Sequence, residues 1–435
     1  MASPTELHQT AAPRYLRRRC SGHVVSAKQP ARVHIVDTWI AFATVLGALT
    51  GAWVHLHSSS IWYDEAITLL TTSGHAKLDW ALGLGQFNPS ADLGKITAEL
   101  YQQDVHPPLY FWTLAIWRTV FGGSLEVARS LSAVFTTGTL LLLYRFARDL
   151  PLRWASIPVA VYALSAVGLR YAYNARPYAM ASFLIVLTLF LVHRRSKWTG
   201  ICAAACVATH YFAALCVVPM LLFQCVREWQ TKRRTGAILV AISFLLGCAP
   251  LALMLRVQIG ARPLQYPGFG PFHKELWALL KGSMESVVPS TWLPHWGFAL
   301  WVAAFFVAVG CWRASKNHDL SLLPLTYFGF LIGFMLLIMV TNKSVVKMPA
   351  DYYLGIAAPL LAILIGLGVN SLPRAGPVLA LVVIAGTLTS VSMTKSPDYR
   401  RMSQQIRAEC NQCPSWWALF TRVPYLCACY MKQRE

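Results

Sequence analysis

Long apolar blocks, separated by short polar loops, run along almost the whole chain of 435 residues. Each block is about 15–25 residues long, which is the length that an α-helix needs to cross a bilayer. Because lipid offers no hydrogen bonds to the backbone, each span must satisfy its own polar groups. The alternating pattern of a membrane β-barrel is absent. The pattern therefore predicts an all-α polytopic membrane protein.

We expect about eleven transmembrane helices, because that many apolar blocks are long enough to be spans. The predicted spans lie near 35–56, 125–147, 154–172, 177–193, 198–210, 212–226, 235–256, 296–313, 321–340, 352–370 and 375–392.

Composition supports this class and sets the net charge in context. The chain is 56% hydrophobic and 13% charged, with a formal net charge of +20. In a soluble protein such a charge would suggest nucleic acid as a partner. Here the basic residues gather in short loops between apolar blocks, where Lys and Arg act as topology signals. No nucleic-acid-binding motif is visible, so we expect no nucleic acid partner.

Four basic loops decide the predicted orientation. They lie near 145–153, 194–197, 227–234 and 313–316. If they are cytoplasmic together with the basic N-terminal tail, the number of spans between any two of them must be even. Parity then divides 198–226 into two short helices that turn near His210. It also makes 106–121, which carries Arg118 and several aromatic residues, a helix lying in the membrane interface rather than a span.

This topology gives three parts. Residues 1–34 form a cytoplasmic basic tail, 35–392 the transmembrane domain and 393–435 a C-terminal extracytoplasmic tail. The large first extracytoplasmic loop covers about 57–124, and a second covers about 257–295. The polar turns share that face, so we expect a multi-pass cell-membrane protein with its active site on the extracytoplasmic side.

Two adjacent carboxylates follow the first span directly. Asp64 and Glu65 stand in the segment WYDEAITL, beside Trp62 and Tyr63. Desolvation raises the pKa of a carboxylate, which helps it to accept a proton from a hydroxyl. The alternative is that these are ordinary acids of a loop leaving the membrane.

Further polar turns are predicted on the same face. In DVHPPLYFW, His106 precedes two prolines and suits either a metal or phosphate ligand or a histidine satisfied at a helix start. In RYAYNARPYAM, Arg170 and Arg176 stand among tyrosines. The arginine fork matches phosphate oxygens, although arginine at a membrane end also snorkels without further function.

Two later turns complete the set. THYF carries His210 where parity requires a turn, and TNKSVVKMPADYY carries Lys343 and Lys347 on the outside, against the charge rule. A bound phosphate would explain that exception.

Several of these motifs, in the same order, resemble the bacterial branch of the dolichyl-phosphate-mannose protein mannosyltransferase superfamily. The resemblance rests on WYDEAITL, HPPLYFW, LEVARSLSAVFTTGTLLLLYRFARDL, the YNARPYA turn and the THYF turn. It covers roughly 35–260, with DYYLGIAAPLLAIL and PDYRRM beyond. This branch includes lipopolysaccharide-modifying glycosyltransferases and aminoarabinose transferases, and it has the GT-C fold.

The resemblance implies an outward-facing site fed by a polyprenyl-phosphate sugar. Asp64 matches the general base and Glu65 the acid that follows it, and both are expected to be catalytic. Asn174 stands where relatives often have a second acid, so a two-carboxylate metal site is in doubt. A divalent metal is left open, with Glu65 and His106 as its candidate ligands, and no cofactor is certain. Asp351 replaces the usual Arg of a later Arg-Tyr pair, so the phosphate role passes to Lys347 or is lost. The expected substrate-binding residues are His106, Arg170, Tyr173, Asn174, Arg176, Tyr178, His210 and Lys347.

The expected function is that of a membrane glycosyltransferase, in the bacterial inner membrane. It would move a sugar from a polyprenyl-phosphate donor to a hydroxyl of an envelope glycan, lipid or protein, with inversion. The rivals are a lipid or solute transporter or flippase and an inactive GT-C-like scaffold. Transporters bury ionisable residues in their spans and often show paired halves. These spans are nearly free of charge, with Arg129 the main exception, and no halves match.

The C-terminal tail carries a separate cysteine pattern. Cys410, Cys413, Cys427 and Cys429 have a spacing that suits four zinc ligands. Outside the cytoplasm the same cysteines would form disulfides, and an unbonded cluster is the third reading.

Overall fold

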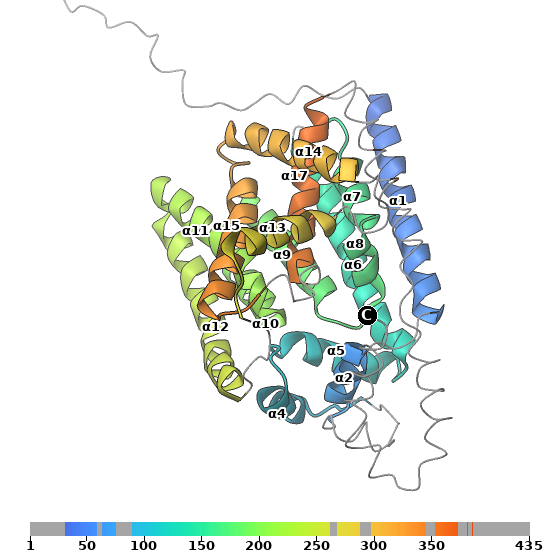
Figure 1. Ribbon diagram of the computed structural model, residues 1–435, viewed down its shortest axis with the longest axis vertical. Coiled ribbons are helices and arrows are strands. Elements are labelled where there is room, and N and C mark those ends of the chain that lie inside the picture. Colours follow the sequence, from blue (N-terminus) through green and yellow to red (C-terminus); the bar gives the residue numbers. More distant parts are fainter. Residues whose placement is uncertain are drawn as a thin grey trace, which may run out of the picture.

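The computed structural model describes residues 31–58, 63–74, 89–150, 152–261, 268–287, 297–344 and 353–372, with Leu381 and Ala385. Every element in these ranges is a helix, which confirms the all-α class (Figure 1). The α-helices are α1 (Ala31–Ser58), α2 (Tyr63–Thr72), α4 (Leu93–Gln103), α5 (Leu109–Phe121), α6 (Leu125–Asp149), α7 (Ser156–Ala163), α8 (Ala166–Tyr173), α9 (Tyr178–His193), α10 (Thr199–Thr209), α11 (Ala214–Gln230), α12 (Arg234–Ala261), α13 (Phe272–Glu285), α14 (Gly297–Ser315), α15 (Leu322–Val340) and α17 (Ala358–Asn370). Two 3₁₀-helices are η2 (Tyr211–Ala213) and η3 (Gly355–Ala357).

Within these ranges, five helices are long and apolar enough to cross a membrane, or six if the bent pair α8 and α9 counts as one span. The five are His34–Leu56, Leu125–Asp149, Tyr211–Gln230, Arg234–Gln258 and Leu322–Val340. Helices also form at the shorter predicted spans, but Thr199–Thr209, Leu300–Ser315 and Gly355–Asn370 are only 10–17 residues long. A multi-pass membrane protein is therefore supported, whereas the count of about eleven spans stays a prediction.

The segment 154–172, expected as one span, folds as two short helices, α7 and α8. α7 ends at Ala163, and Ser165 caps α8, because its hydroxyl accepts the backbone N–H of Gly168 at 2.9 Å. Gly168 lies so close to the Tyr162 carbonyl oxygen that an added Cβ would collide with it. Serine is a favoured N-cap because its side-chain oxygen satisfies a free N–H of the first turn. A local cap therefore interrupts a segment that hydropathy reads as continuous.

The break at His210 agrees with the parity argument. α10 ends at Thr209, His210 is extended (φ −157°, ψ 120°), and η2 leads into α11. α5, at 13 residues, is not among the helices long enough to span a membrane. Its predicted place in the interface stays a prediction.

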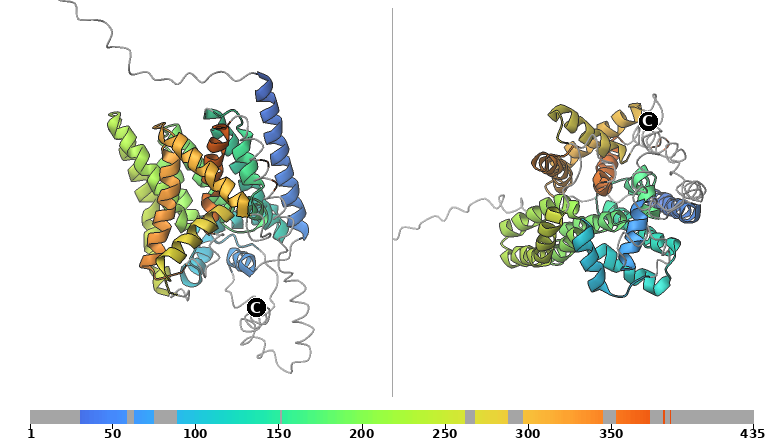
Figure 2. Two further views of the ribbon diagram at one scale, coloured as in Figure 1. Left: turned by 45° about the horizontal axis from the view of Figure 1, so that its top comes forward. Right: turned by 60° about the horizontal axis from the view of Figure 1, so that its bottom comes forward.

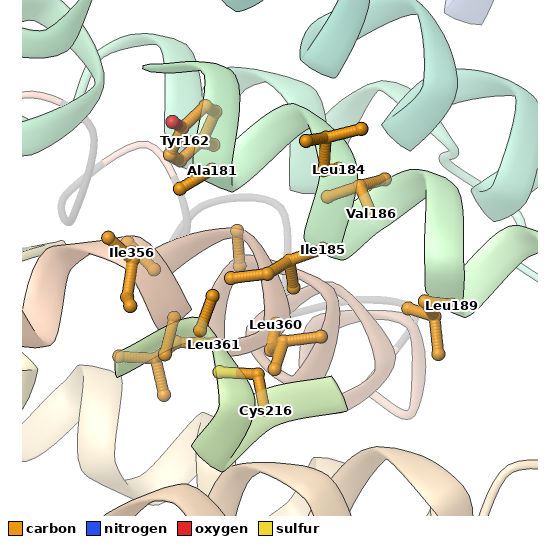
Figure 3. Close-up of a cluster of buried hydrophobic side chains, with 14 of the residues drawn as sticks. Tyr162, Ala181, Leu184, Ile185, Val186, Leu189, Cys216, Ile356, Leu360 and Leu361 are labelled. Atoms are coloured by element: carbon orange, nitrogen blue, oxygen red, sulfur yellow. The ribbon is translucent and has the colours of Figure 1, made fainter. Parts of the chain in front are cut away.

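α17 forms the centre of the bundle and is buried along its whole length from Ala358 to Val369. Figure 3 shows part of this core, where Leu360 and Leu361 lie near Ile185 of α9 and Cys216 of α11. α14 crosses α17 at backbone contact, because a Cβ at Gly310 or Gly368 would meet a carbonyl oxygen of the other helix.

Three short helices, α2, α4 and α5, gather where α1 ends, at the bottom of the view in Figure 1. We call this the site end of the bundle. At the opposite end, one ion pair joins the basic loops 145–153 and 194–197, and a second joins the loop 227–234 to Asp319, just after 313–316. Arg194 pairs with Asp149 at 2.6 Å, and Arg227 pairs with Asp319 at 2.6 Å. The Gln224 amide donates to the Ser196 carbonyl at 3.0 Å and connects the two sets. The loops thus share one end, as parity requires; which side of the membrane that end faces stays a prediction.

α13 falls in the segment 257–295 that was expected as an outer loop, yet it packs against α14 and α15 (Figure 2). Near its start, Glu275 accepts the Ser344 hydroxyl at 2.6 Å, just beyond the end of α15. Near its end, the Ser283 hydroxyl lies 2.7 Å from the Tyr327 hydroxyl, in the second turn of α15. α13 therefore follows most of the length of a candidate span.

Candidate functional site

Asp64 and Glu65 lie in the first turn of α2, where the helix dipole favours negative charge. Their surroundings differ sharply. The Asp64 side chain is 35% exposed, whereas that of Glu65 is 1% exposed. Only one of the two adjacent carboxylates is therefore open to an incoming molecule.

Glu65 is held by charge-assisted hydrogen bonds to two other elements. Arg129 of α6 donates from Nε to Oε1 at 3.0 Å and from Nη2 to Oε2 at 2.7 Å. The backbone N–H of Ala175, between α8 and α9, donates to Oε1 at 2.8 Å. Arg129 also donates from Nη1 to the carbonyl of Leu56, at the end of α1, at 3.3 Å. Both oxygens of Glu65 are engaged, and the pair joins four segments of the chain.

Asp64 faces Arg176, which lies in the turn between α8 and α9. The Arg176 Nη2 is 3.8 Å from Asp64 Oδ2. Its Nη1 donates to the Asp64 carbonyl at 3.3 Å and to the Thr68 hydroxyl at 3.1 Å. The guanidinium is buried, which lowers its pKa, but Tyr178, Asp64 and Asp104 outweigh that effect and the pKa is raised. Arg176 is thus a fixed cation that donates hydrogen bonds to the start of α2.

His106 lies on the far side of Arg176. Its Nδ1 is 2.7 Å from Asp104 Oδ1, and its Nε2 is 3.3 Å from Arg176 Nη2. A guanidinium can only donate, so Nε2 is the acceptor and Nδ1 carries the proton that points to Asp104. Burial raises the pKa of Asp104, but its hydrogen bond from His106, the charge of Arg176 and the backbone N–H of Val105 lower it well below the usual range. Asp104 therefore stays ionised and fixes the tautomer of His106.

The loop that carries His106 is tied to α12 by Gln258. The Gln258 amide donates to the carbonyls of Leu100 at 3.0 Å and His106 at 3.2 Å, and it accepts the Tyr211 hydroxyl at 2.9 Å. Sequence reasoning missed this residue. Its one signal was an amide near the end of a mostly apolar helix.

His210 lies beside the same group, enclosed by aromatic rings. Its ring centroid is 6.0 Å from that of His106, 5.5 Å from Tyr178 and 5.4 Å from Phe212. Burial, helped by the charge of Arg176, lowers the pKa of His210 well below its ordinary value. Its Nδ1 is buried and makes no hydrogen bond within the part of the chain that the structure describes. His210 is therefore a neutral histidine with one unused polar atom.

Arg118 stabilises the other end of α2. Its Nη1 donates to the carbonyl of Leu69 at 3.2 Å and to the hydroxyl of Thr72 at 2.6 Å, and its Nη2 donates to the carbonyl of Gly123 at 3.0 Å. A cation at a helix C-terminus satisfies carbonyls that have no partner inside the helix. The sequence indicated an interfacial arginine, and the structure gives it a fully buried capping contact.

The remaining predicted residues lie around this centre or beyond the described ranges. Tyr173 stacks on His55 with ring centroids 4.7 Å apart, and Arg170 is half-buried one turn earlier. Asn174 is buried, and its carbonyl accepts the Ser132 hydroxyl at 2.6 Å. Lys347, Trp62 and the four C-terminal cysteines lie outside the described residues, as do Asp351 and the side chain of Tyr63.

The proposed metal ligands do not converge. Among the described residues, no group of three or more His, Cys, Asp or Glu side chains is placed to hold a metal ion. Glu65 has both oxygens on Arg129 and Ala175, and His106 has both ring nitrogens on Asp104 and Arg176. In this arrangement Glu65 and His106 do not fit a metal site.

Residues 105–253 match the family model described as dolichyl-phosphate-mannose-protein mannosyltransferase. The match confirms the resemblance over this segment, where the chain carries a domain of that family. It contains His106, Arg129, Arg176 and His210, whereas Asp64 and Glu65 precede it. No curated protein gives a significant match to the chain.

Proposed function

We propose that this protein transfers a sugar from a polyprenyl-phosphate donor to a hydroxyl of an envelope acceptor, on the extracytoplasmic face of the membrane. The observation that carries the proposal is the partly exposed carboxylate of Asp64, held by the buried cation of Arg176 at the site end. The family domain supports a lipid-phosphate sugar as the donor class. The sugar and the acceptor, whether glycan, lipid or protein, are left open, as is a role in lipopolysaccharide synthesis.

Asp64 is the proposed general base. It takes the proton of the acceptor hydroxyl while that oxygen attacks the anomeric carbon of the sugar. The bond between the anomeric carbon and the phosphate oxygen breaks, and the electron pair leaves with the polyprenyl phosphate. A single displacement of this kind inverts the anomeric configuration.

The contacts favour Asp64 over Glu65 for this role. Glu65 is almost fully buried, and both of its oxygens accept hydrogen bonds. A carboxylate with its lone pairs used in this way cannot reach an acceptor hydroxyl without breaking an ion pair. We therefore assign Glu65 a positioning role that sets the start of α2, in place of the catalytic role expected for it.

The leaving phosphate needs fixed cations close to the anomeric carbon. Both Nη atoms of Arg176 already contact Asp64, Thr68 or His106. Arg176 with Arg170, and Lys347, are the candidates for the phosphate. Tyr173 and Tyr178 offer rings for the sugar.

The test is turnover of undecaprenyl-phosphate mannose and undecaprenyl-phosphate aminoarabinose by purified protein in liposomes. Asp64→Asn keeps the shape of the side chain but removes the proton acceptor, so turnover should fall about 10²–10⁴-fold. Asp319→Asn, the same change at the opposite end, should leave turnover unchanged. Near wild-type turnover in Asp64→Asn would remove this residue from the mechanism. Movement of labelled lipid across the bilayer without sugar transfer would support a flippase instead.

A further inference from the structure

We infer that His106 is a positioning residue whose Nε2 holds the guanidinium of Arg176 against Asp64. The inference rests on the proposed function and names a device inside the same site. His106 was expected to bind substrate, phosphate or metal, and its contacts point to a different task.

Four side chains lie in a row in space, from Asp104 in the loop before α5 to the proposed base Asp64. Asp104 Oδ1 is 2.7 Å from His106 Nδ1, His106 Nε2 is 3.3 Å from Arg176 Nη2, and Arg176 Nη2 is 3.8 Å from Asp64 Oδ2. The same Nη2 therefore faces an uncharged acceptor on one side and the proposed base on the other.

The chemistry of that position explains why a neutral acceptor suits it. A carboxylate in place of His106 would compete with Asp64 for the charge of Arg176. A lysine would repel the guanidinium, since both groups only donate. A neutral imidazole accepts one hydrogen bond without adding charge, provided that its other nitrogen carries the proton. Asp104 enforces that condition, as a carboxylate does for many functional histidines.

The residues around His106 hold its loop in place. Pro107 and Pro108 are buried and restrict the backbone after His106. Gln258 accepts the Tyr211 hydroxyl and donates to the carbonyl of His106, which fixes the loop to α12. Gln258 lies beyond residues 105–253, the segment that matches the family model.

Two conservative substitutions separate the contacts of the ring. In His106→Gln, the amide oxygen can reach the place of Nε2 and accept from Arg176. In His106→Asn, the shorter amide can reach Asp104 in the place of Nδ1 but not Arg176. If the Arg176 contact is what matters, glutamine restores function and asparagine does not.

The experiment measures kcat and KM for undecaprenyl-phosphate sugar turnover in both variants, with the melting temperature of each as the control for folding. We expect His106→Asn to lower kcat by about 10²-fold, the loss typical of a small misplacement of a catalytic group, with KM for the donor changed less than about threefold. His106→Gln should recover most of kcat.

The outcomes distinguish this inference from the proposed function. If the two variants lose kcat equally while both remain folded, or if neither loses it, the positioning role is overturned. If Asp64→Asn retains turnover, the proposed base is wrong whatever the His106 variants show. A rise in donor KM alone, without loss of kcat, would make His106 a binding residue and would also overturn the inference.

Discussion

Glu65 and Arg129 form a buried bidentate ion pair between α2 and α6, with each side chain 1% exposed. Removing one partner of such a pair leaves a charge without compensation in a low-dielectric interior. The pair holds the helix on which Asp64 stands, so its integrity sets the height and direction of the proposed base.

Glu65→Gln should therefore lower the free energy of unfolding by about 3–5 kcal/mol. The double variant Glu65→Gln/Arg129→Met, which removes both charges, should lose much less than the sum of the single variants. Denaturant unfolding in detergent micelles measures all three. Asp149→Asn breaks the more exposed pairs with Arg145 and Arg194 and should cost only about 0–1 kcal/mol for each pair. Equal stability of Glu65→Gln and the wild type would contradict a structural role for the pair.

Sequence reasoning could place the helices because the bilayer imposes a length and an apolar composition on each span. It also located the turn at His210, because the number of spans between two basic loops must be even, and that count does not depend on local contacts. It marked Arg129 only as an exception to the charge-free spans, because its partner is 64 residues away in sequence and no periodicity links them.

The same limit applies to the contacts of the candidate site. The motif containing Asp64 was visible, but nothing local indicated that Arg176 would face it or that Gln258 would fix the His106 loop. Such contacts depend on how close two segments come after folding. The division of 154–172 was missed for a different reason, since a capping serine changes the backbone without changing the hydropathy.

The crossing of α14 and α17 predicts a strong dependence on two glycines. Gly310→Ala and Gly368→Ala each place a Cβ against a backbone carbonyl that cannot move alone. Overpacking of this kind typically costs about 1–3 kcal/mol, so each variant should melt at a lower temperature. Gly47→Ala is the matched control, because nothing lies within 4 Å of its added Cβ. That change in α1 should be neutral or slightly stabilising; an equal loss in all three variants would contradict the close crossing.

His210 should make stability depend on pH. Its pKa is lowered in the folded protein, so the unfolded chain takes up a proton more readily. The contribution of His210 is therefore complete above the ordinary histidine pKa of 6.5 and declines as the pH falls below it. His210→Phe keeps an aromatic ring and cannot titrate. We expect the melting temperature of the wild type to fall more steeply than that of His210→Phe between about pH 7 and pH 5. Parallel curves would show that His210 does not titrate differently in the two states.

α13 should lie within the apolar part of the membrane. Trp277 is 60% exposed and stands on the same helix as Ser283, which contacts α15. A single cysteine replacing Trp277, in a variant without the native cysteines, should react with a membrane-permeant maleimide and resist an impermeant one applied from either side. A cysteine replacing the exposed Lys316 is the control and should react with the impermeant reagent from one side. Rapid reaction at both positions would place α13 in water.

The contacts of Glu65 also limit the order in which the chain can fold during its synthesis. Its carboxylate needs Arg129 and the N–H of Ala175, and Ala175 is synthesised 110 residues after Glu65. Until then, the Glu65 carboxylate at the start of α2 lacks the hydrogen bond from Ala175. The segment that bears Asp64 can settle only after α6 has been inserted and the chain has turned toward α9. A chain stopped short of that turn would leave the Glu65 carboxylate without the N–H of Ala175.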